Sequence, residues 1–550
     1  MGVPALTLPV NDFSGSETNK PYRILSGINT YNGPWGTSQA AHLLKRTMFG
    51  SSAADMAYFK TKSMSQAVDE LVNNAFTLTS QPVNDYNDDT YTDADVPAGQ
   101  TWINAPYNDM ADFKRIYSLK KWQIGQFINQ GRSIQLKMQL FWHNHFATHI
   151  GDLGISKMFY DHHMLLRSNA LGNFKTLTKA VTKDCLMLRY LSGESNTKYA
   201  PNENYGRELQ ELFCVGKGPN SQYTEDDVQT AARVLTGWKV DYDTSASYFD
   251  INEHDTDDKV FSPFYNNTVI QGRTDAAAGN TELNDLLTMI FNTDECALFI
   301  CRKLYRWFVY YDIDDVTEEN VIVPLATIFR NGGYEIKPVL KALLKSEHFF
   351  DAANYGVLIK SPLDFCAGFC REFKIKFPPA SDYLSNYQHW DTLNYFTSIM
   401  KQEYGDPPNV AGWPAYYQSP AFHEIWINST TYPIRTDFSR WLVEYGFDRN
   451  GTNIKADVVA FAASLSAPGN PNTLISDSLD ILYRVPVSQA SRDTLKKNTL
   501  LDGQANDYYW TGAWNSYAGD TGNAIKRSVV EQRLINLYRY LVNSPEFQLA

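Results

Sequence analysis

The sequence lacks the short motifs by which many enzymes are recognised. It contains no G-x-S-x-G elbow, no phosphate-binding loop, no G-x-G-x-x-G fingerprint and no H-E-x-x-H zinc motif. Cysteine is also scarce, since six in 550 residues are too few for a disulfide scaffold. None forms a C-x-x-C pair suited to zinc, so we expect free thiols buried in helices.

Long apolar runs are absent as well. None reaches the ~18 residues needed to span a bilayer, and the longest candidate, Leu298 to Tyr311, is interrupted by Cys301, Arg302, Lys303 and Arg306. The first residues lack the basic and apolar regions of a signal peptide. We therefore expect no transmembrane segment, and no signal peptide is visible in this chain.

Positive charge is in deficit, with 49 Lys and Arg against 61 Asp and Glu and a formal charge of −12. This balance argues against an electrostatic binder of nucleic acid or anionic membranes. Hydrophobic residues make up 43% of the chain and charged residues 20%, which excludes the disordered class. Aromatic residues reach 14%, led by 34 Tyr, whose polar tips suit wet clefts as well as cores.

Helical periodicity dominates and strand signals are nearly absent. The pattern predicts a mainly α fold, a large multi-helix body with long irregular loops and at most a small β-hairpin insertion. We expect an irregular N-terminal arm over 1–36 and a single large helical domain over 37–550. Within that domain we distinguish a helical core over 37–240, a loop insertion over 241–283 and a helical second half over 284–550. Two further loops are expected, at 81–100 and 502–520.

Three histidines fall within seven residues, in the predicted helix 132–149. His145 and His149 are one helical turn apart, which is the spacing that lets two imidazoles reach one metal. His143 points about 160° away from His145 by the helical period. The alternative is a packing layer in which Trp142, Phe146 and neutral histidines are satisfied partners.

The predicted helix 202–215 offers a carboxylate beside an arginine. Glu203 and Arg207 are i and i+4 partners, and Glu208 flanks the buried stripe, so we expect Glu208 to be half buried. A half-buried carboxylate needs a cation, a metal or hydrogen-bond donors to stay charged. A routine surface pair on a structural helix is the alternative.

Two neighbouring segments add weaker candidates. Thr224 and Asp227 predict a capped helix that ends near Gly237, from which Arg233 and Trp238 could reach a cleft. In the insertion, His254 and Asp255 lie among further carboxylates that could supply a metal shell, although a solvated acidic loop is the alternative.

Tryptophans mark two loop segments of the second half. The stretch 406–414 is rich in Pro and Gly and fixes a rigid turn that presents Trp413, and Trp426 follows it. Scaffolded loops often carry function, so both tryptophans, with Tyr508, Tyr509, Trp510 and Trp514, are candidates for a binding surface.

Five stretches together resemble the bacterial family catalogued as domain of unknown function 1800. They are Ala41 to Gly50, Phe141 to Phe146, Pro201 to Phe213, Tyr223 to Trp238 and Pro407 to Pro414. The resemblance implies a bacterial, envelope-associated and therefore extracytoplasmic protein with a sulfatase-like or phosphatase-like partner. It implies no activity.

Two hypotheses of function follow. In the first, the protein is an enzyme that acts on a glycan or another extracytoplasmic substrate, and its catalytic residues are His143, His145, Glu208 and Arg207. The chemistry is either metal-free acid-base catalysis or catalysis by a divalent metal. The metal would be held by His145, Glu208, His254 and Asp255. Arg233, Trp238, Trp413 and Trp426 would bind the substrate. In the second, the protein is a non-catalytic glycan- or protein-binding scaffold that uses its aromatic surface.

Overall fold

The computed structural model describes residues 25–78, 80–149 and 154–550. Over these residues nearly all regular structure is helical, and the strands form three two-stranded antiparallel sheets. The mainly α prediction is therefore confirmed. Residues 25–36 of the expected N-terminal arm run without a helix, and residues 1–24 lie outside the described residues.

The N-terminal half supplies the helices at the centre of the molecule and those at one end. The central ones are α1 (Thr37–Thr47), α2 (Ala53–Lys60), α3 (Met64–Asn73), α4 (Asp109–Ile128), α5 (Gln135–His145) and α6 (Ser156–Ser168). The end is formed by α7 (Phe174–Thr182), α8 (Cys185–Tyr190), α9 (Glu203–Glu208), α10 (Glu225–Val234) and α11 (Ala278–Phe291), with strands β1 (Trp238–Asp241), β2 (Ala246–Phe249), β3 (Lys259–Val260) and β4 (Val269–Ile270). A π-helical segment, η2 (Leu209–Cys214), continues α9.

The second half returns to the centre and then builds the opposite end. Its central helices are α12 (Asp294–Phe308), α13 (Asp315–Thr317), α14 (Val323–Asn331), α15 (Ile336–Leu344), α16 (Pro362–Glu372) and α17 (Tyr383–Ile399). The remaining elements are α18 (Thr431–Glu444), β5 (Phe447–Arg449), β6 (Thr452–Ile454), α19 (Val458–Ala463), α20 (Pro471–Leu482), α21 (Gln489–Thr499), α22 (Tyr508–Ala518) and α23 (Ala524–Asn543).

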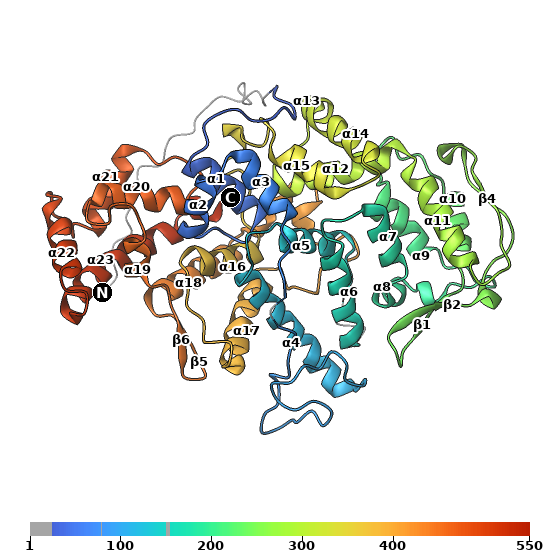
Figure 1. The fold of residues 1–550 in the computed structure, drawn as a ribbon, viewed down its shortest axis with the longest axis horizontal. Coiled ribbons are helices and arrows are strands. Elements are labelled where there is room, and N and C mark those ends of the chain that lie inside the picture. Colours follow the sequence, from blue (N-terminus) through green and yellow to red (C-terminus); the bar gives the residue numbers. More distant parts are fainter. Residues whose placement is uncertain (1–24, 79, 150–153) are drawn as a thin grey trace.

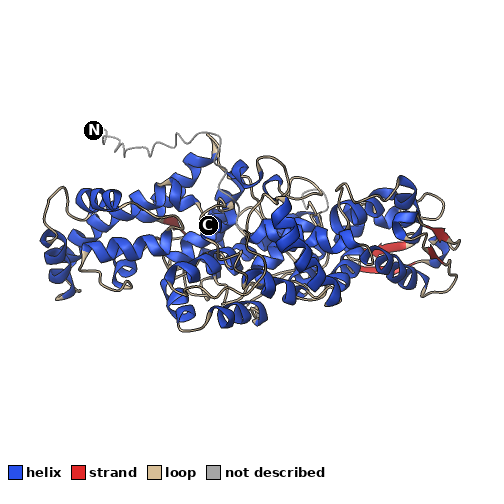
Figure 2. Ribbon diagram, turned by 90° about the horizontal axis from the view of Figure 1, so that it is seen from above, coloured by secondary structure: helices blue, strands red, loops and turns tan. Residues whose placement is uncertain are grey.

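The molecule is elongated, and its two ends come from different parts of the chain (Figure 1). Helices α19 to α23 form one end, and α7 to α11 with the strands β1 to β4 form the other. Figure 2 shows these strands gathered at the tip of that second end. Between the ends, α1 to α3 lie beside α15 and α16, so segments distant in sequence meet at the centre.

One large apolar core runs through the body and a smaller one lies beside α4, α6 and α8. The fully buried Trp142 belongs to the first and Trp122 to the second. All six cysteines are buried, in agreement with the expected core thiols. The large core packs α5 against α12, which places the end of α5 at the centre of the molecule.

Local signals set several helix ends as predicted. The side chain of Thr224 accepts a hydrogen bond from the backbone of Asp227, whose carboxylate accepts one from the backbone of Thr224, closing a capping box at the start of α10. The insertion holds the expected small hairpin as β3 and β4. A further hairpin, β1 and β2, was not expected and begins before the insertion, at Trp238. This end of the molecule is therefore specified largely by local sequence.

Two boundaries differ from prediction. Helix α5 ends at His145, so His149 lies beyond it and the predicted turn between these histidines does not form. The expected loop 502–520 contains helix α22, because Trp510, Trp514 and Tyr517 recur at helical spacing and are buried. In α22 the burial of aromatic rings outweighs the turn signals of Gly and Asn.

Candidate functional site

Three consecutive side chains at the end of α5 each hold a different element. His143 contacts the segment that follows α17, Asn144 contacts the loop after it, and His145 contacts η2 and α12. His143 and His145 face opposite ways, as the helical period predicts. The end of α5 is thus the junction at which the candidate site is assembled.

His143 is buried and serves as a hydrogen-bond acceptor. Its Nε2 accepts from the backbone N–H of Gly405 over 3.2 Å, and its ring lies against those of His163 and Tyr404. Burial, assisted by the charge of His162 and Lys120, lowers the pKa of His143 to about 3. The imidazole is therefore neutral at physiological pH and positions the loop.

Asn144 fixes the turn at Trp413. Its Oδ1 accepts a hydrogen bond from the backbone N–H of Trp413 over 2.8 Å. The preceding Gly412 has φ +91°, and a Cβ there would lie 2.4 Å from the backbone oxygen of Asn144. Only glycine fits this close approach, so the turn before Trp413 requires Gly412.

His145 joins α5 to α12 through both ring nitrogens. Nε2 donates to the carbonyl of Phe213 over 3.0 Å, so Nδ1 is free to accept from Nζ of Lys303, also over 3.0 Å. Burial first, and then the charge of Lys303, hold the pKa of His145 well below its usual range. With both nitrogens engaged, His145 has none left for a metal.

Helix α12 presents one polar and aromatic face to this junction. Phe299, Lys303, Arg306 and Trp307 stand at i, i+4, i+7 and i+8, so they share one side of the helix. Cys296, Ile300 and Leu304, which adjoin this face, pack into the core. Burial, reinforced by Arg306, lowers the pKa of Lys303 to about 7.

These side chains line a cavity of about 210 Å³, here called the Lys303 cavity. Its walls come from α5, η2, α12 and the loop after Gly405. They comprise Phe141, Asn144, His145, Glu211, Leu212, Lys217, Phe299, Lys303, Arg306, Trp307, Ala411, Tyr416 and Tyr417. Glu211 is engaged in an ion pair with Lys217. Lys303 and Arg306 form no ion pair with any carboxylate of the described residues.

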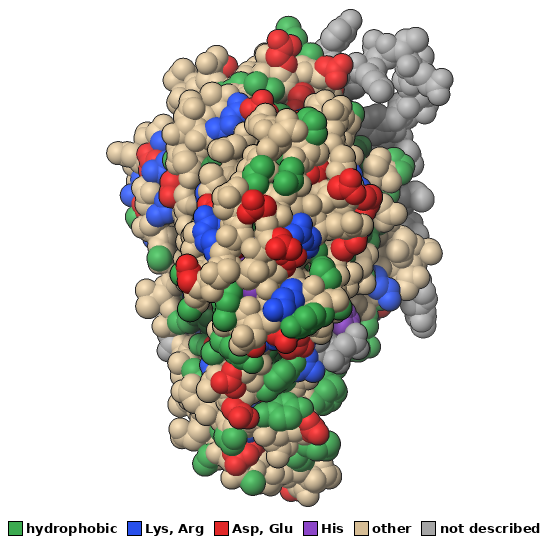
Figure 3. Space-filling model, turned by 90° about the vertical axis from the view of Figure 1, so that its right-hand side faces the viewer, with side chains coloured by type: hydrophobic (Ala, Val, Ile, Leu, Met, Phe, Trp, Pro, Cys, Tyr) green, Lys and Arg blue, Asp and Glu red, His purple; other side chains and the backbone are tan. Residues whose placement is uncertain are grey.

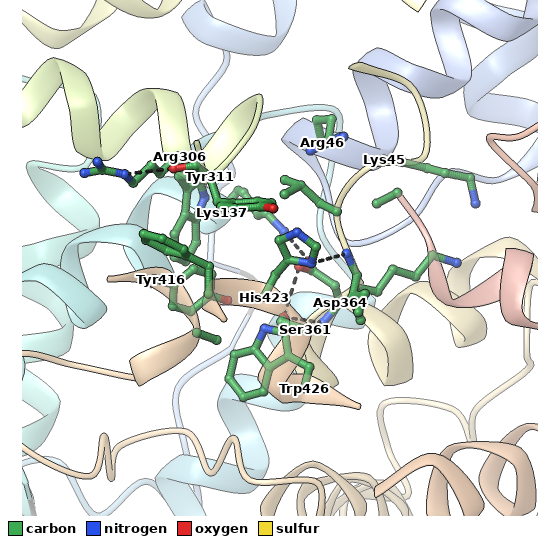
Figure 4. A pocket seen from close by; sticks show the side chains of 17 residues that line it. Lys45, Arg46, Lys137, Arg306, Tyr311, Ser361, Asp364, Tyr416, His423 and Trp426 are labelled. Carbon is green, nitrogen blue, oxygen red and sulfur yellow. Dashed lines mark hydrogen bonds and ion pairs between the residues drawn. The ribbon is translucent and has the colours of Figure 1, made fainter. Parts of the chain in front are cut away.

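A smaller cavity of about 50 Å³, here called the His423 cavity, shares Arg306, Trp307 and Tyr416 with the first. In Figure 4, Lys137, Ser361 and Asp364 converge beside His423. Lys137 forms an ion pair with Asp364, whereas the ammonium of Lys45, which points away, pairs with Glu372.

Several donors face the His423 cavity without an acceptor. His423 Nδ1 accepts the backbone N–H of Ile359 over 3.2 Å, so a neutral ring carries its proton on Nε2. Burial, with the charge of Arg46, lowers the pKa of His423 to about 4. His423 Nε2, Trp307 Nε1 and Arg46 Nε are buried and have no hydrogen-bond partner among the described residues. The two cavities together form a donor-rich, cationic site.

The predicted carboxylate is not one of the residues that line these cavities. Glu208 is half buried, as expected, and burial together with Glu211 raises its pKa. Arg207 pairs with Glu203 over 3.0 Å and with Glu225 over 2.6 Å. The surface-pair alternative for Arg207 is thus the one observed, and neither residue lines the Lys303 cavity.

The candidates of the insertion hold the hairpins together. His254 Nε2 lies 3.2 Å from Glu282 Oε1, and Lys259 pairs with the same carboxylate over 2.7 Å. Arg233 pairs with Asp255 over 2.7 Å, and Trp238 is buried against Phe249. Their contacts are structural.

The predicted metal set is not assembled. No group of three or more His, Cys, Asp or Glu side chains within the described ranges is arranged to hold a metal ion. His145 bonds Phe213 and Lys303, whereas His254 bonds Thr236 and Glu282. The predicted metal ligands, grouped by sequence pattern alone, belong to separate hydrogen-bond and ion-pair networks in the folded protein.

The tryptophans predicted to form a surface are buried. Trp413 is 1% exposed and packs on His143, and Trp426 is 3% exposed and lines the His423 cavity. Trp510 is 0% and Trp514 7% exposed, because α22 turns them inward; Tyr508 and Tyr509 are exposed. Of these candidates Trp426 alone lines either of the two cavities.

Sequence reasoning missed Lys303, Arg306, Tyr416 and His423. A signal for two of them was present, since Lys303 and Arg306 are the cations that break the apolar run of α12. Their spacing on one helical face could have marked them.

None of the helices described is long and apolar enough to cross a membrane.

The chain was compared with known proteins. Searches of curated proteins and of solved structures gave no match. The model of the family described as protein of unknown function (DUF1800) matches residues 42–549. The match covers the end of α5, α12 and both cavities, and the chain therefore belongs to the DUF1800 family.

Proposed function

We propose that the protein binds a small organic ligand carrying an oxyanion group, in the linked Lys303 and His423 cavities. The observation that carries this proposal is that Lys303 and Arg306 face one cavity and no carboxylate of the described residues pairs with them. Half-buried cations that form no ion pair are costly, because they are partly withdrawn from water. An anionic ligand would offset that cost.

The site stands out against the rest of the chain. The protein carries a formal charge of −12, and on the face seen in Figure 3 acidic and basic side chains are interspersed. The His423 cavity has one acidic side chain, Asp364, already paired with Lys137. Arg306, shared by both cavities, offers the planar guanidinium that binds carboxylate, sulfate and phosphate through two parallel hydrogen bonds.

The dimensions and walls narrow the ligand class. A volume of 210 Å³ holds about seven water molecules at ~30 Å³ each, which suits a small molecule. Phe299, Trp307 and Tyr416 supply apolar and aromatic walls, on which an organic skeleton packs. An acidic sugar or a short-chain acid fits this description.

This proposal replaces the metal-dependent hypothesis and keeps His145 in a different role. His145 positions Lys303, and Glu208 lies outside the two cavity linings. The extracytoplasmic location, the bacterial origin and the sulfatase-like or phosphatase-like partner that the family resemblance implies stay predictions.

Isothermal titration calorimetry at low ionic strength tests the proposal. The probes are pyruvate, glucuronate, inorganic phosphate and inorganic sulfate, with glucose as the uncharged counterpart of glucuronate. We expect an organic acid to bind and glucose not to bind. Binding of inorganic phosphate or sulfate alone would assign the site to the free ion and overturn the organic ligand.

Matched variants locate the site. Arg306→Gln should weaken binding at least about tenfold, the loss of roughly one charge-assisted hydrogen bond. Arg302→Gln is the control, since Arg302 stands one turn earlier on α12 but pairs with Glu295 and Glu318. Equal affinities for both variants and the wild type would contradict the proposed site.

A further inference from the structure

We propose that Lys303 is a nucleophilic amine that forms an imine with a carbonyl carbon of the bound ligand. The inference rests on the proposed function, because the same cavity holds the ligand. It assigns the ligand to the oxo acids, molecules that carry an aldehyde or ketone beside an oxyanion group.

The hydrogen bonds of Lys303 leave one position of its amine free. Nζ donates to His145 Nδ1 over 3.0 Å and to the carbonyl of Leu212 over 3.1 Å. A neutral amine has two hydrogens, and both are accounted for by these acceptors. Its lone pair occupies the remaining tetrahedral position, which has no hydrogen-bond partner among the described residues. Because Lys303 lines the cavity, a ligand carbon can approach that position.

The surroundings of Lys303 favour the neutral amine. Burial and the neighbouring charge of Arg306 lower the pKa of Lys303 to about 7. The other groups facing the cavity are neutral His145 and the paired Glu211 and Lys217. The ring of Phe299, 4.7 Å from Nζ at its centroid, adds an apolar wall. A larger share of Lys303 is thus neutral at pH 7 than of an ordinary lysine.

Two buried lysines of the centre are differently engaged. Lys45 and Lys137 each form an ion pair with a carboxylate, from Glu372 and Asp364 respectively. Burial lowers the pKa of both lysines as well, but each nitrogen is bonded to a carboxylate, which attracts the charged form of the amine. Lys303 has instead two neutral acceptors, and these hold the amine in place without stabilising its charged form as a carboxylate would.

The proposed step balances as follows. The lone pair of Nζ attacks the carbonyl carbon, a C–N bond forms, and the carbonyl oxygen takes up a proton to give a carbinolamine. The nitrogen loses one proton to solvent at this stage. As the C–O bond then breaks, the nitrogen loses its second proton, and the hydroxyl takes up a proton from solvent and leaves as water. The product is an imine joined to Lys303, with no change of oxidation state. His145 is a positioning residue, since it acts by orienting Nζ.

Reductive trapping on the full chain tests the inference. The protein is incubated at pH 7 with glyoxylate and cyanoborohydride, which converts an imine into a stable secondary amine, and labelled lysines are mapped by mass spectrometry. We expect Lys303 to be labelled at least about tenfold faster than the exposed Lys497. Labelling of Lys303 no faster than that of Lys497 would overturn the inference.

Two comparisons separate this inference from the proposed function. Arg306→Gln should slow labelling by glyoxylate more than labelling by acetaldehyde. Acetaldehyde lacks the carboxylate, so its labelling responds only to the rise in the pKa of Lys303 when Arg306 is lost. Equal effects on both would overturn the assignment to oxo acids. Calorimetric binding of glyoxylate without labelling of Lys303 would leave the anion site standing and refute the imine. Lys303→Arg keeps the charge and should abolish labelling at position 303, and a thermal melt checks that this variant is folded.

Discussion

Lys303 Nζ donates a hydrogen bond to His145 Nδ1 over 3.0 Å, joining α12 to the end of α5 across 158 residues of sequence. The two side chains depend on each other, because His145 orients the amine and the nearby ammonium disfavours protonation of the ring. The hydrogen bond thus joins two helices and also positions the amine proposed to form the imine.

The pair predicts a double-mutant result. His145→Phe should destabilise the protein by about 1–3 kcal/mol, because the buried amine of Lys303 and the carbonyl of Phe213 each lose a partner. Adding Lys303→Met should recover part of that loss, since no unpaired amine remains. Urea unfolding of the four proteins of the cycle measures this coupling, and strictly additive losses would contradict it.

The lowered pKa of Lys303 predicts a pH dependence of stability. Below pH 7 the amine is charged in both the folded and the unfolded chain. The free energy of unfolding is then lowered by the full cost of withdrawing the charge from water. Between pH 7 and about 10 the unfolded chain binds more protons, so the wild type should gain stability relative to Lys303→Met. Unfolding of both proteins at pH 6, 8 and 9.5 tests this, and a constant difference would refute it.

The turn at Gly412 predicts a steric effect. Gly412→Ala should cost at least about 2 kcal/mol more than Gly503→Ala, because both glycines have positive φ but the new Cβ meets an obstacle only at position 412. The obstacle is the backbone of Asn144 at 2.4 Å, whereas nothing lies within 4 Å at Gly503. Thermal unfolding compares the two variants. Similar melting temperatures would show that the loop yields at little cost.

The insertion predicts a large effect of one buried carboxylate. Glu282→Gln should destabilise the protein by about 3–5 kcal/mol, because the buried ammonium of Lys259 loses its counter-charge. Asp294→Asn is the control: its pair with Arg330 is exposed, and its loss should cost about 0–1 kcal/mol. Comparable values for the two would contradict the importance of burial.

The same carboxylate predicts sensitivity to acid. Burial raises the pKa of Glu282, but hydrogen bonds from His254 and Lys259 outweigh it and leave the pKa below its usual value. A depressed pKa stabilises the fold above about pH 4.3 and loses this contribution as pH falls through the folded value. The stability of Glu282→Gln should therefore fall less steeply than that of the wild type between pH 5 and 3, as measured by urea unfolding.

Local signals were enough for the helices and for contacts within them. Thr224 and Asp227 close their capping box because both partners stand three residues apart in one turn. Glu203 and Arg207 pair for a similar reason, at a spacing of four. Where apolar burial competed with turn residues, as around Trp510 and Trp514, local reading failed, because the gain came from packing against distant helices.

The sequence by itself determined the mainly α class, the family, the half-buried state of Glu208 and the divergence of His143 from His145, because each follows from spacing within one helix or from short motifs. Only the tertiary structure decided which side chains contact one another at the centre of the molecule. In the folded protein, His145 contacts Lys303, His254 lies beside Glu282, and Trp413 is buried. The reason is physical: contacts between residues of different elements depend on how those elements pack, and no pattern within one helix records that.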